Sequence, residues 1–294
     1  MAHHVSADDA DARCWAEEFW PQIDWQDAEV RHGAFHLVVL PRVGPVLRIT
    51  VGHGHATQMG REVGVLATFE QVGLSLPVPR LESEPLFDTE RSGVLISRVP
   101  GRDGPDRDWD ERLSRTYRSL LDELAAIDLV SVADLPQPRS WCGEGRWSDL
   151  IADELLGLLE ASVRTAAVDV VAAVLDHGQD GEPRLCHGDF GPHNLSWTNG
   201  EVVGWIDLDH ACVADLAVDL APLVGFYGAD AVESMAGGDH IDRAMIHRAS
   251  LPLQVAAAAH LKGYISLRDH ALANFTSRHR QGVSYDPGGR HPRL

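Results

Sequence analysis

The sequence predicts an α+β chain of two lobes, a small β-rich N-terminal lobe and a larger, mainly helical C-terminal lobe. Short apolar runs bounded by glycine and proline fill the first part of the chain, whereas apolar residues at helical spacing dominate after residue 105. A mostly polar and acidic run over residues 102–111 separates the two patterns. We therefore expect an N-terminal lobe over 1–100, a C-terminal lobe over 101–275 and a disordered basic tail over 276–294.

The first lobe is expected to combine strands with two helices. Its start is acidic and rich in tryptophan, and its later apolar runs are short and β-branched. The expected elements are a helix around 10–20, a strand pair over 34–40 and 46–50, a helix over 58–70, and a strand over 93–99 that leads into Pro100-Gly101.

The second lobe carries apolar stripes that recur every three or four residues, which is typical of helices packed on one face. These stripes indicate core packing and no chemistry. The expected helices are 113–127, 147–159 and 163–175, followed by further helices from 229 to about 275, one of which Pro252 must start or kink.

The most informative stretch is 185–207, LCHGDFGPHNLSWTNGEVVGWID. Asn199-Gly200 between two apolar runs predicts a hairpin with a type I′ turn, because that turn needs positive φ at both central residues. Counting outward from the turn places Thr198 opposite Glu201 and Asn194 opposite Trp205.

Three polar side chains would then meet at the open end of this hairpin. Asp207 lies just beyond the last strand residue, Asn194 begins the first strand, and Asp189 precedes it in a loop of glycine and proline. Mg²⁺ prefers such oxygen ligands, and a further carboxylate beside the metal can accept a hydroxyl proton. The pattern indicates phosphoryl transfer. The alternative is a hairpin with carboxylates at its end by chance.

Composition excludes several other classes of protein. Asp plus Glu outnumber Lys plus Arg by 44 to 25, and the formal charge of −19 disfavours nucleic acid and anionic membranes as partners. Lys262 is the single lysine, so no Gly-Lys-Ser/Thr phosphate loop exists and Schiff-base chemistry is improbable. The charge suits a cationic small-molecule substrate, although acidity more often serves solubility.

Location and redox state are expected to be those of the cytoplasm. The cysteines are far apart and show no CxxC spacing, which favours free thiols over disulfides or a zinc site. The N-terminus lacks the basic and apolar regions of a signal peptide, and no run approaches the about 18 apolar residues of a membrane helix. We expect a monomer or weak dimer.

The pattern His-x-Asp-x4-Asn followed by Ile-Asp resembles the catalytic signature of the aminoglycoside phosphotransferase family, distant relatives of protein kinases. The resemblance covers about residues 33–227 and implies a protein-kinase-like fold. It implies that Asp189 is the catalytic base and that Asn194 and Asp207 hold Mg²⁺. Asp219 would brace the catalytic loop, and His187 would support that loop rather than transfer protons.

The resemblance also implies a nucleotide site for ATP or GTP. Arg48 occupies the strand position where the family has lysine, or in some members arginine, and Glu62 would pair with it. Backbone groups of Ser97 and Val99 would face the base, and Ile206 would line the same site. The alternatives are an exposed strand arginine and a glutamate favoured by a helix N-terminus.

Substrate specificity is predicted from weaker signals. Segments 33–39, 95–101 and 219–221 resemble the viomycin and capreomycin phosphotransferases, and 213–219 resembles the macrolide phosphotransferases, which favour GTP. Asp209, Asp230 and Glu233 are candidates to bind a cationic antibiotic, or are simply solvated. A kinase for a choline-like or homoserine-like metabolite, and a nucleotide-binding pseudokinase without activity, remain as alternatives.

Overall fold

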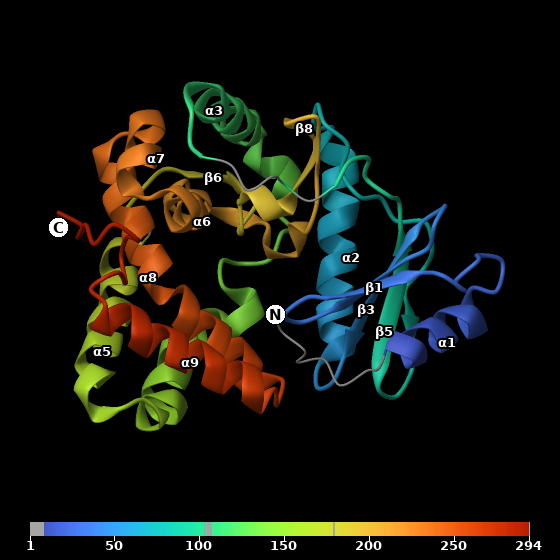
Figure 1. Ribbon diagram of the computed structural model, residues 1–294, viewed down its shortest axis with the longest axis horizontal. Coiled ribbons are helices and arrows are strands. Elements are labelled where there is room, and N and C mark those ends of the chain that lie inside the picture. The colour runs from blue at the N-terminus through green and yellow to red at the C-terminus, as the bar shows by residue number, and fades with distance from the viewer. Residues whose placement is uncertain (1–8, 103, 105–107, 179, 294) are drawn as a thin grey trace.

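The computed structural model describes residues 9–102, 104, 108–178 and 180–293. Figure 1 shows a β-rich N-terminal part beside a helical C-terminal part, which confirms the predicted α+β class. The expected boundary run over 102–111 lies partly outside the described residues, as do residues 1–8 and the last residue, 294.

A single antiparallel sheet with the strand order β1-β2-β3-β5-β4 forms the described N-terminal part. Trp15 of helix α1 packs on one face of the sheet with Leu47 and Ile49, together with the tryptophans that follow the helix, and helix α2 covers the other face at Val46. Every residue of β3 is therefore buried. The elements are α1 Asp9–Phe19, β1 Glu29–His32, β2 Leu37–Leu40, β3 Val46–Val51, α2 His55–Val72, β4 Leu86–Phe87 and β5 Arg91–Ile96.

Glycine at one sheet position permits the packing of α1. A Cβ at Gly93 would lie 2.5 Å from the ring of Trp15, so no larger residue fits there without movement of the helix. The sequence prediction missed β1, because its residues are polar and alternate between exposed and half-buried positions. It also placed the start of β2 too early, since the chain turns at Gly33–His36 before it pairs.

Helices dominate the C-terminal part. Helix α3 begins at Asp110, whose side chain accepts a hydrogen bond from the Leu113 N–H at 2.7 Å. No helix within the described residues is long and apolar enough to cross a membrane. The helices are α3 Glu111–Ala125, α4 Trp147–Leu150, α5 Ala161–His177, α6 Ala217–Tyr227, α7 Ala229–Ala236, α8 Gly238–Leu261 and α9 Ile265–Arg280, with short 3₁₀ turns at Leu129–Val132, Ser140–Cys142 and Glu144–Arg146.

One helix prediction needs correction, and a second is narrowed to one of its two alternatives. The helix expected over 147–159 breaks after α4 into a π turn (Ile151–Leu155) and a 3₁₀ turn (Leu156–Leu158). The wider π turn rotates Leu158 toward solvent and keeps Leu159 in the core. Pro252 lies inside α8 and does not begin a helix.

The predicted hairpin is present, with a different register. Asn199 and Gly200 have φ of 53° and 77°, as a type I′ turn requires, and Thr198 faces Glu201. An irregularity between Ser196 and Trp197 then shifts the pairing by one residue. The strands are β7 Leu195–Thr198 and β8 Glu201–Trp205, beside a second pair, β6 Pro183–Cys186 and β9 Cys212–Asp215.

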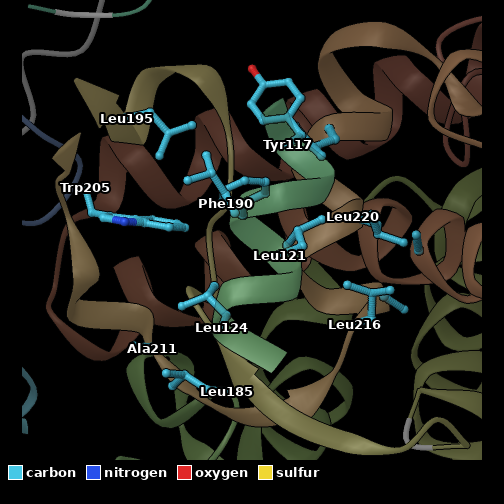
Figure 2. Close-up of a cluster of buried hydrophobic side chains, with 14 of the residues drawn as sticks. Tyr117, Leu121, Leu124, Leu185, Phe190, Leu195, Trp205, Ala211, Leu216 and Leu220 are labelled. Carbon is cyan, nitrogen blue, oxygen red and sulfur yellow. The ribbon is translucent and has the colours of Figure 1, made fainter. Parts of the chain in front are cut away.

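An apolar core lies directly beneath the loop between β6 and β7. Figure 2 shows Phe190 from this loop inserted between Tyr117 of α3 and Trp205 of β8, at ring-centroid distances of 5.5 and 5.8 Å. Phe190 is fully buried. The residue next to Asp189 therefore anchors the loop to the hydrophobic core.

The C-terminal segment is ordered, contrary to the expected disordered tail from residue 276. Helix α9 extends to Arg280, and Asp286 accepts a hydrogen bond from the Ala229 N–H at the start of α7. Buried Arg248 of α8 donates to the carbonyls of Val283 and Ser284 at 2.7 and 2.6 Å. These buried polar contacts hold the segment, and its basic composition did not reveal them.

We expect acid to destabilise the protein through buried His247. Burial and the nearby Arg139 guanidinium lower its pKa to about 3, from 6.5 when exposed. The unfolded chain therefore takes up the proton first, so stability present above pH 6.5 is lost as the pH falls toward 3, by about 2 kcal/mol near pH 5. Urea titrations of wild type and His247→Gln across this range would measure the slope.

The exposed residue His279, replaced by glutamine, serves as the matched control for this experiment. A loss of unfolding free energy in acid that is equally steep in His247→Gln and in wild type would contradict the assignment.

Candidate active site

The loop between β6 and β7 is held by a buried carboxylate. Asp219 of α6 accepts hydrogen bonds from the backbone N–H groups of His187 and Gly188 at 2.9 and 2.8 Å. Burial raises the pKa of Asp219 to about 7, against the lowering effect of these two donors. A Cβ at Gly188 would lie 2.0 Å from the His210 carbonyl oxygen, so this loop needs glycine here.

His187 supports the loop from within. Its Nε2 atom lies 3.0 Å from the Ile206 carbonyl oxygen at the end of the hairpin, and its side chain is fully buried. Burial lowers the pKa of this imidazole, which keeps it neutral. The ring therefore joins the loop to the hairpin.

Asp189 and Asn194 contact each other at the start of the hairpin. The Asn194 amide donates through Nδ2 to the backbone oxygen and to Oδ2 of Asp189, both at 2.8 Å. Burial raises the pKa of Asp189, but the hydrogen bond and charge of His193 outweigh it, so the pKa lies below its ordinary value. Asp189 is therefore an ionised carboxylate with a fixed orientation.

Asp207 follows the hairpin in a left-handed backbone conformation, with φ of 60°. The shifted register places Trp205 opposite Leu195, which corrects the expected pairing of Trp205 with Asn194. The Ile206 N–H instead bonds to the Asn194 carbonyl at 3.1 Å. Relative to the predicted register, Asp207 is thus shifted by one residue, and it still lies at the open end of the hairpin.

Arg48 links the two parts of the molecule through a buried ion cluster. It pairs with Glu62 of α2, and its Nη1 atom donates to Asp207 Oδ1 at 2.8 Å. Burial raises the pKa of Glu62 to about 7 despite the adjacent guanidinium. Burial raises the pKa of Asp207 too, but Arg48 outweighs it and holds that pKa well below its ordinary value.

Two further residues complete this cluster. Asp209 Oδ2 lies 3.8 Å from Arg48 Nη2, and His36 Nε2 lies 3.8 Å from Asp207 Oδ1. Ligand atoms of His36, Asp207 and Asp209 lie within 4.8 Å of one another. Asp209, a candidate substrate ligand from the sequence, instead faces the arginine on β3.

A cleft of about 270 Å³ lies between the sheet and the hairpin. Ser97, Val99 and Ile206 line it together with Arg48, Asn194 and Asp207. The linker after β5 is fixed on the hairpin because Arg102 and Trp197 exchange backbone hydrogen bonds of 3.0 and 2.8 Å. The cleft thus contains the residues that the sequence assigned to nucleotide and metal, except for Glu62, which pairs with Arg48 and does not line the cleft.

The turn between β1 and β2 reaches the helical part of the molecule. Phe35 packs against Trp141 at 6.2 Å, and Trp141 stacks on His210 at 4.7 Å with an interplanar angle of 16°. The Lys262 ammonium lies 5.8 Å from the centre of the Phe35 ring. Aromatic contacts therefore link the two parts of the molecule here, in addition to the ion cluster around Arg48.

Asp230 and Glu233, which were predicted as substrate ligands, lie outside the cleft and already have arginine partners. Both are on α7 and pair with Arg290 of the C-terminal segment, with Asp230 at 2.9 Å. Glu233 also binds Arg293 at 2.9 Å. Neither residue is among the described residues that line the cleft. Sequence gave no sign of these arginine partners because they lie about 60 residues away.

Two residues of the site were missed from the sequence. His36 lies in the ion cluster, and His193 Nε2 lies 3.4 Å from Asp189 Oδ2 while also lining the cleft. Burial lowers the pKa of His193, but its bond to Asp189 raises it above the ordinary value. The available signal was its position beside Asn194 within the His-x-Asp-x4-Asn pattern.

The structure combines a β-rich part and a helical part, a cleft between the sheet and the hairpin, and a loop between β6 and β7 that Asp219 holds in place. The model of the phosphotransferase enzyme family, APH, matches residues 43–253. This match spans more than half of the chain. The chain belongs to that family and is a phosphotransferase.

Solved structures share this fold over almost the whole chain. The complex of APH(2")-IIIa with GDP and kanamycin matches with a TM-score of 0.74 at 16% identity, over 92% of this chain and 99% of that one. The macrolide 2'-phosphotransferase MphH from Brachybacterium faecium matches with 0.59 at 17% identity, over 90% and 97%. A mutant of APH(4)-Ia with AMP-PNP and hygromycin B matches with 0.61 at 16%, over 92% and 98%. A sequence search of curated proteins finds no significant match.

We expect Arg48→Met to destabilise the protein strongly, because Glu62 is then buried without its cation. Breaking such a buried pair costs roughly 3–5 kcal/mol of unfolding free energy, measurable by urea titration. Arg48→Lys keeps the charge but loses the forked geometry, so its cost is expected to be intermediate. The control is Arg115→Met, which removes an exposed ion pair on α3. Equal stability of Arg48→Met and the control would refute the role of the cluster.

Proposed function

We propose that this protein transfers the γ-phosphoryl group of a nucleoside triphosphate to a hydroxyl of an antibiotic, acting in the cytoplasm with Mg²⁺. The observation that carries this proposal is the fixed Asp189 carboxylate beside Asn194, with Asp207 lining the same cleft. Phosphoryl transfer needs positioning and charge neutralisation: the fixed Asp189 would position the acceptor, and a cation held by Asn194 and Asp207 would neutralise phosphate charge.

Asp189 is the group that would accept the proton of the acceptor hydroxyl. Its lowered pKa keeps it ionised, and the Asn194 amide holds one of its oxygens in place. The hydroxyl oxygen forms a bond to the γ-phosphorus, the bond to the nucleoside diphosphate breaks, and the proton moves to Asp189. The pinned Phe190 next to Asp189 limits movement of this base.

Asn194 and Asp207 fit a hard divalent cation. The two hydrogen bonds donated by the Asn194 amide turn its Oδ1 atom away from Asp189, and Asp207 contributes a carboxylate. Amide and carboxylate oxygens are ligands that Mg²⁺ accepts, and the ion, when bound, neutralises phosphate charge. Arg48 contacts Oδ1 of Asp207, so the Oδ2 atom would be the carboxylate oxygen available to the ion.

The linker after β5 would hold the base of the nucleotide. The Ser97 N–H bonds to the Arg80 carbonyl at 2.8 Å, so its own carbonyl and the Val99 N–H are the backbone groups offered to the cleft. One acceptor and one donor suit the edge of either adenine or guanine. We therefore propose ATP or GTP as the phosphoryl donor, and solved relatives carry GDP or AMP-PNP.

The acceptor is proposed from similarity and charge. Structural neighbours bind kanamycin or hygromycin B, or are named macrolide 2'-phosphotransferases. The net charge of −19 favours a cationic antibiotic such as an aminoglycoside or a capreomycin-like peptide. Because Asp230 and Glu233 already have arginine partners, the acidic argument is weaker, and a macrolide is the second candidate.

Mass spectrometry of a phosphorylation panel with ATP and GTP tests this function. The panel holds kanamycin, capreomycin, a macrolide and choline, each with wild type and Asp189→Asn. We expect a product heavier by one HPO₃ from an antibiotic, and a rate roughly 10²–10⁴-fold lower in the variant, because its base is lost.

The exposed residue Asp176, replaced by asparagine, is the matched control and should retain the wild-type rate. Product from choline alone would replace the antibiotic proposal with a metabolite kinase. Nucleotide binding without any product would instead indicate a binding protein.

Removal of divalent cations tests the role assigned to Asn194 and Asp207. We expect EDTA to abolish transfer and added Mg²⁺ to restore it, because the triphosphate charge is otherwise not neutralised. Calorimetric titration of the nucleotide with and without Mg²⁺ measures the same coupling. Full transfer activity in EDTA would count against a metal-dependent site.

A further inference from the structure

An exposed aromatic ring lies next to the catalytic loop. Phe226 of α6 is 54% exposed, although phenylalanine usually gains stability by burial. Its neighbour Tyr227 is partly buried, and its ring packs 5.1 Å from that of Trp109. Of these two aromatic residues at the end of the helix, Phe226 is the more exposed.

Contacts connect Phe226 to the proposed base through a single residue. Its ring centre lies 5.2 Å from that of His193, and His193 Nε2 lies 3.4 Å from Asp189 Oδ2. A Cβ at Gly191 would lie 2.6 Å from the His193 ring and 3.2 Å from the Phe226 ring. Glycine at this loop position therefore permits the two rings to lie against the loop.

The helix fixes the position of Phe226 relative to the loop. Asp219 and Phe226 are seven residues apart, which is about two turns, so they lie on the same face of α6. Asp219 holds the loop at His187 and Gly188, while Phe226 contacts it near its other end. The ring therefore cannot move far from Asp189 without movement of α6.

His193 contacts both the cleft and the ring of Phe226. It lines the nucleotide cleft, whereas Phe226 packs against its ring outside the set of residues that line that cleft. An in-line transfer needs the acceptor on the side of the γ-phosphate opposite the leaving group. His193 contacts both Asp189 and Phe226, so with the nucleotide in the cleft an acceptor could reach Asp189 along the face formed by His193 and Phe226.

We propose that Phe226 forms the acceptor-binding face and selects an acceptor whose hydroxyl is carried on a saturated ring, as in a sugar. This inference rests on the proposed function. The C–H face of such a ring is apolar and flat enough to cover an aromatic side chain, while its hydroxyl points along the edge toward Asp189. An acyclic alcohol offers no comparable face.

Steady-state kinetics of two variants at this position test the proposal. Phe226→Ala removes the ring, and Phe226→Tyr keeps it. With an aminoglycoside or macrolide as acceptor, we expect Phe226→Ala to raise the acceptor KM roughly tenfold, because the apolar contact is lost. Phe226→Tyr should stay within about threefold of wild type. The KM for the nucleotide should change in neither variant.

The matched control is Phe87→Ala, which removes a ring that is 50% exposed on β4 of the sheet, and which should change no constant. A thermal melt of each variant accompanies the kinetics. A Phe226→Ala protein that melts early but keeps the acceptor KM of wild type would overturn the proposal, as would a fall in kcat alone.

The experiment separates this inference from the proposed function. Wild type that phosphorylates no acceptor refutes the function itself. Wild type that phosphorylates antibiotics with a KM insensitive to Phe226→Ala refutes only the acceptor face. Phosphorylation of choline but of no ring-bearing acceptor also overturns the inference.

Discussion

One buried guanidinium holds the relation between the two parts of the molecule. Arg48 projects from the middle of the sheet, pairs with Glu62 of α2 and donates to Asp207 beyond the hairpin. A buried charge must be compensated, so the sheet, the helix and the hairpin cannot separate without a large cost. The cleft between them has its shape because these three charges stay together.

The catalytic loop is fixed independently of that cluster. Asp219 accepts hydrogen bonds from two backbone N–H groups of the loop, and Phe190 is inserted in the core. The Asn194 amide holds the Asp189 carboxylate. Each contact comes from a different element, so the loop is irregular in backbone and still has one arrangement. A base with a defined position can therefore lie on a loop rather than on a helix or strand.

Local signals in the sequence predicted local structure well. The Asn199-Gly200 turn followed from two residue types at short spacing. The register of the hairpin did not, because a bulge depends on how Ser196 packs against the linker. Long-range partners were also beyond reach: nothing in the sequence links Arg290 to α7, so the tail was expected to be disordered.

The proposed sites for the nucleotide and for the acceptor draw on different numbers of structural elements. The proposed nucleotide cleft takes residues from the sheet, the linker and the hairpin, and Arg48 and Asp207 line it. The proposed acceptor face needs only the loop between β6 and β7 and one end of α6. A change at Arg48 therefore alters fold and nucleotide site together, whereas a change at exposed Phe226 leaves the buried contacts intact. It follows that acceptor preference can vary on this fold while the phosphoryl-transfer machinery stays the same.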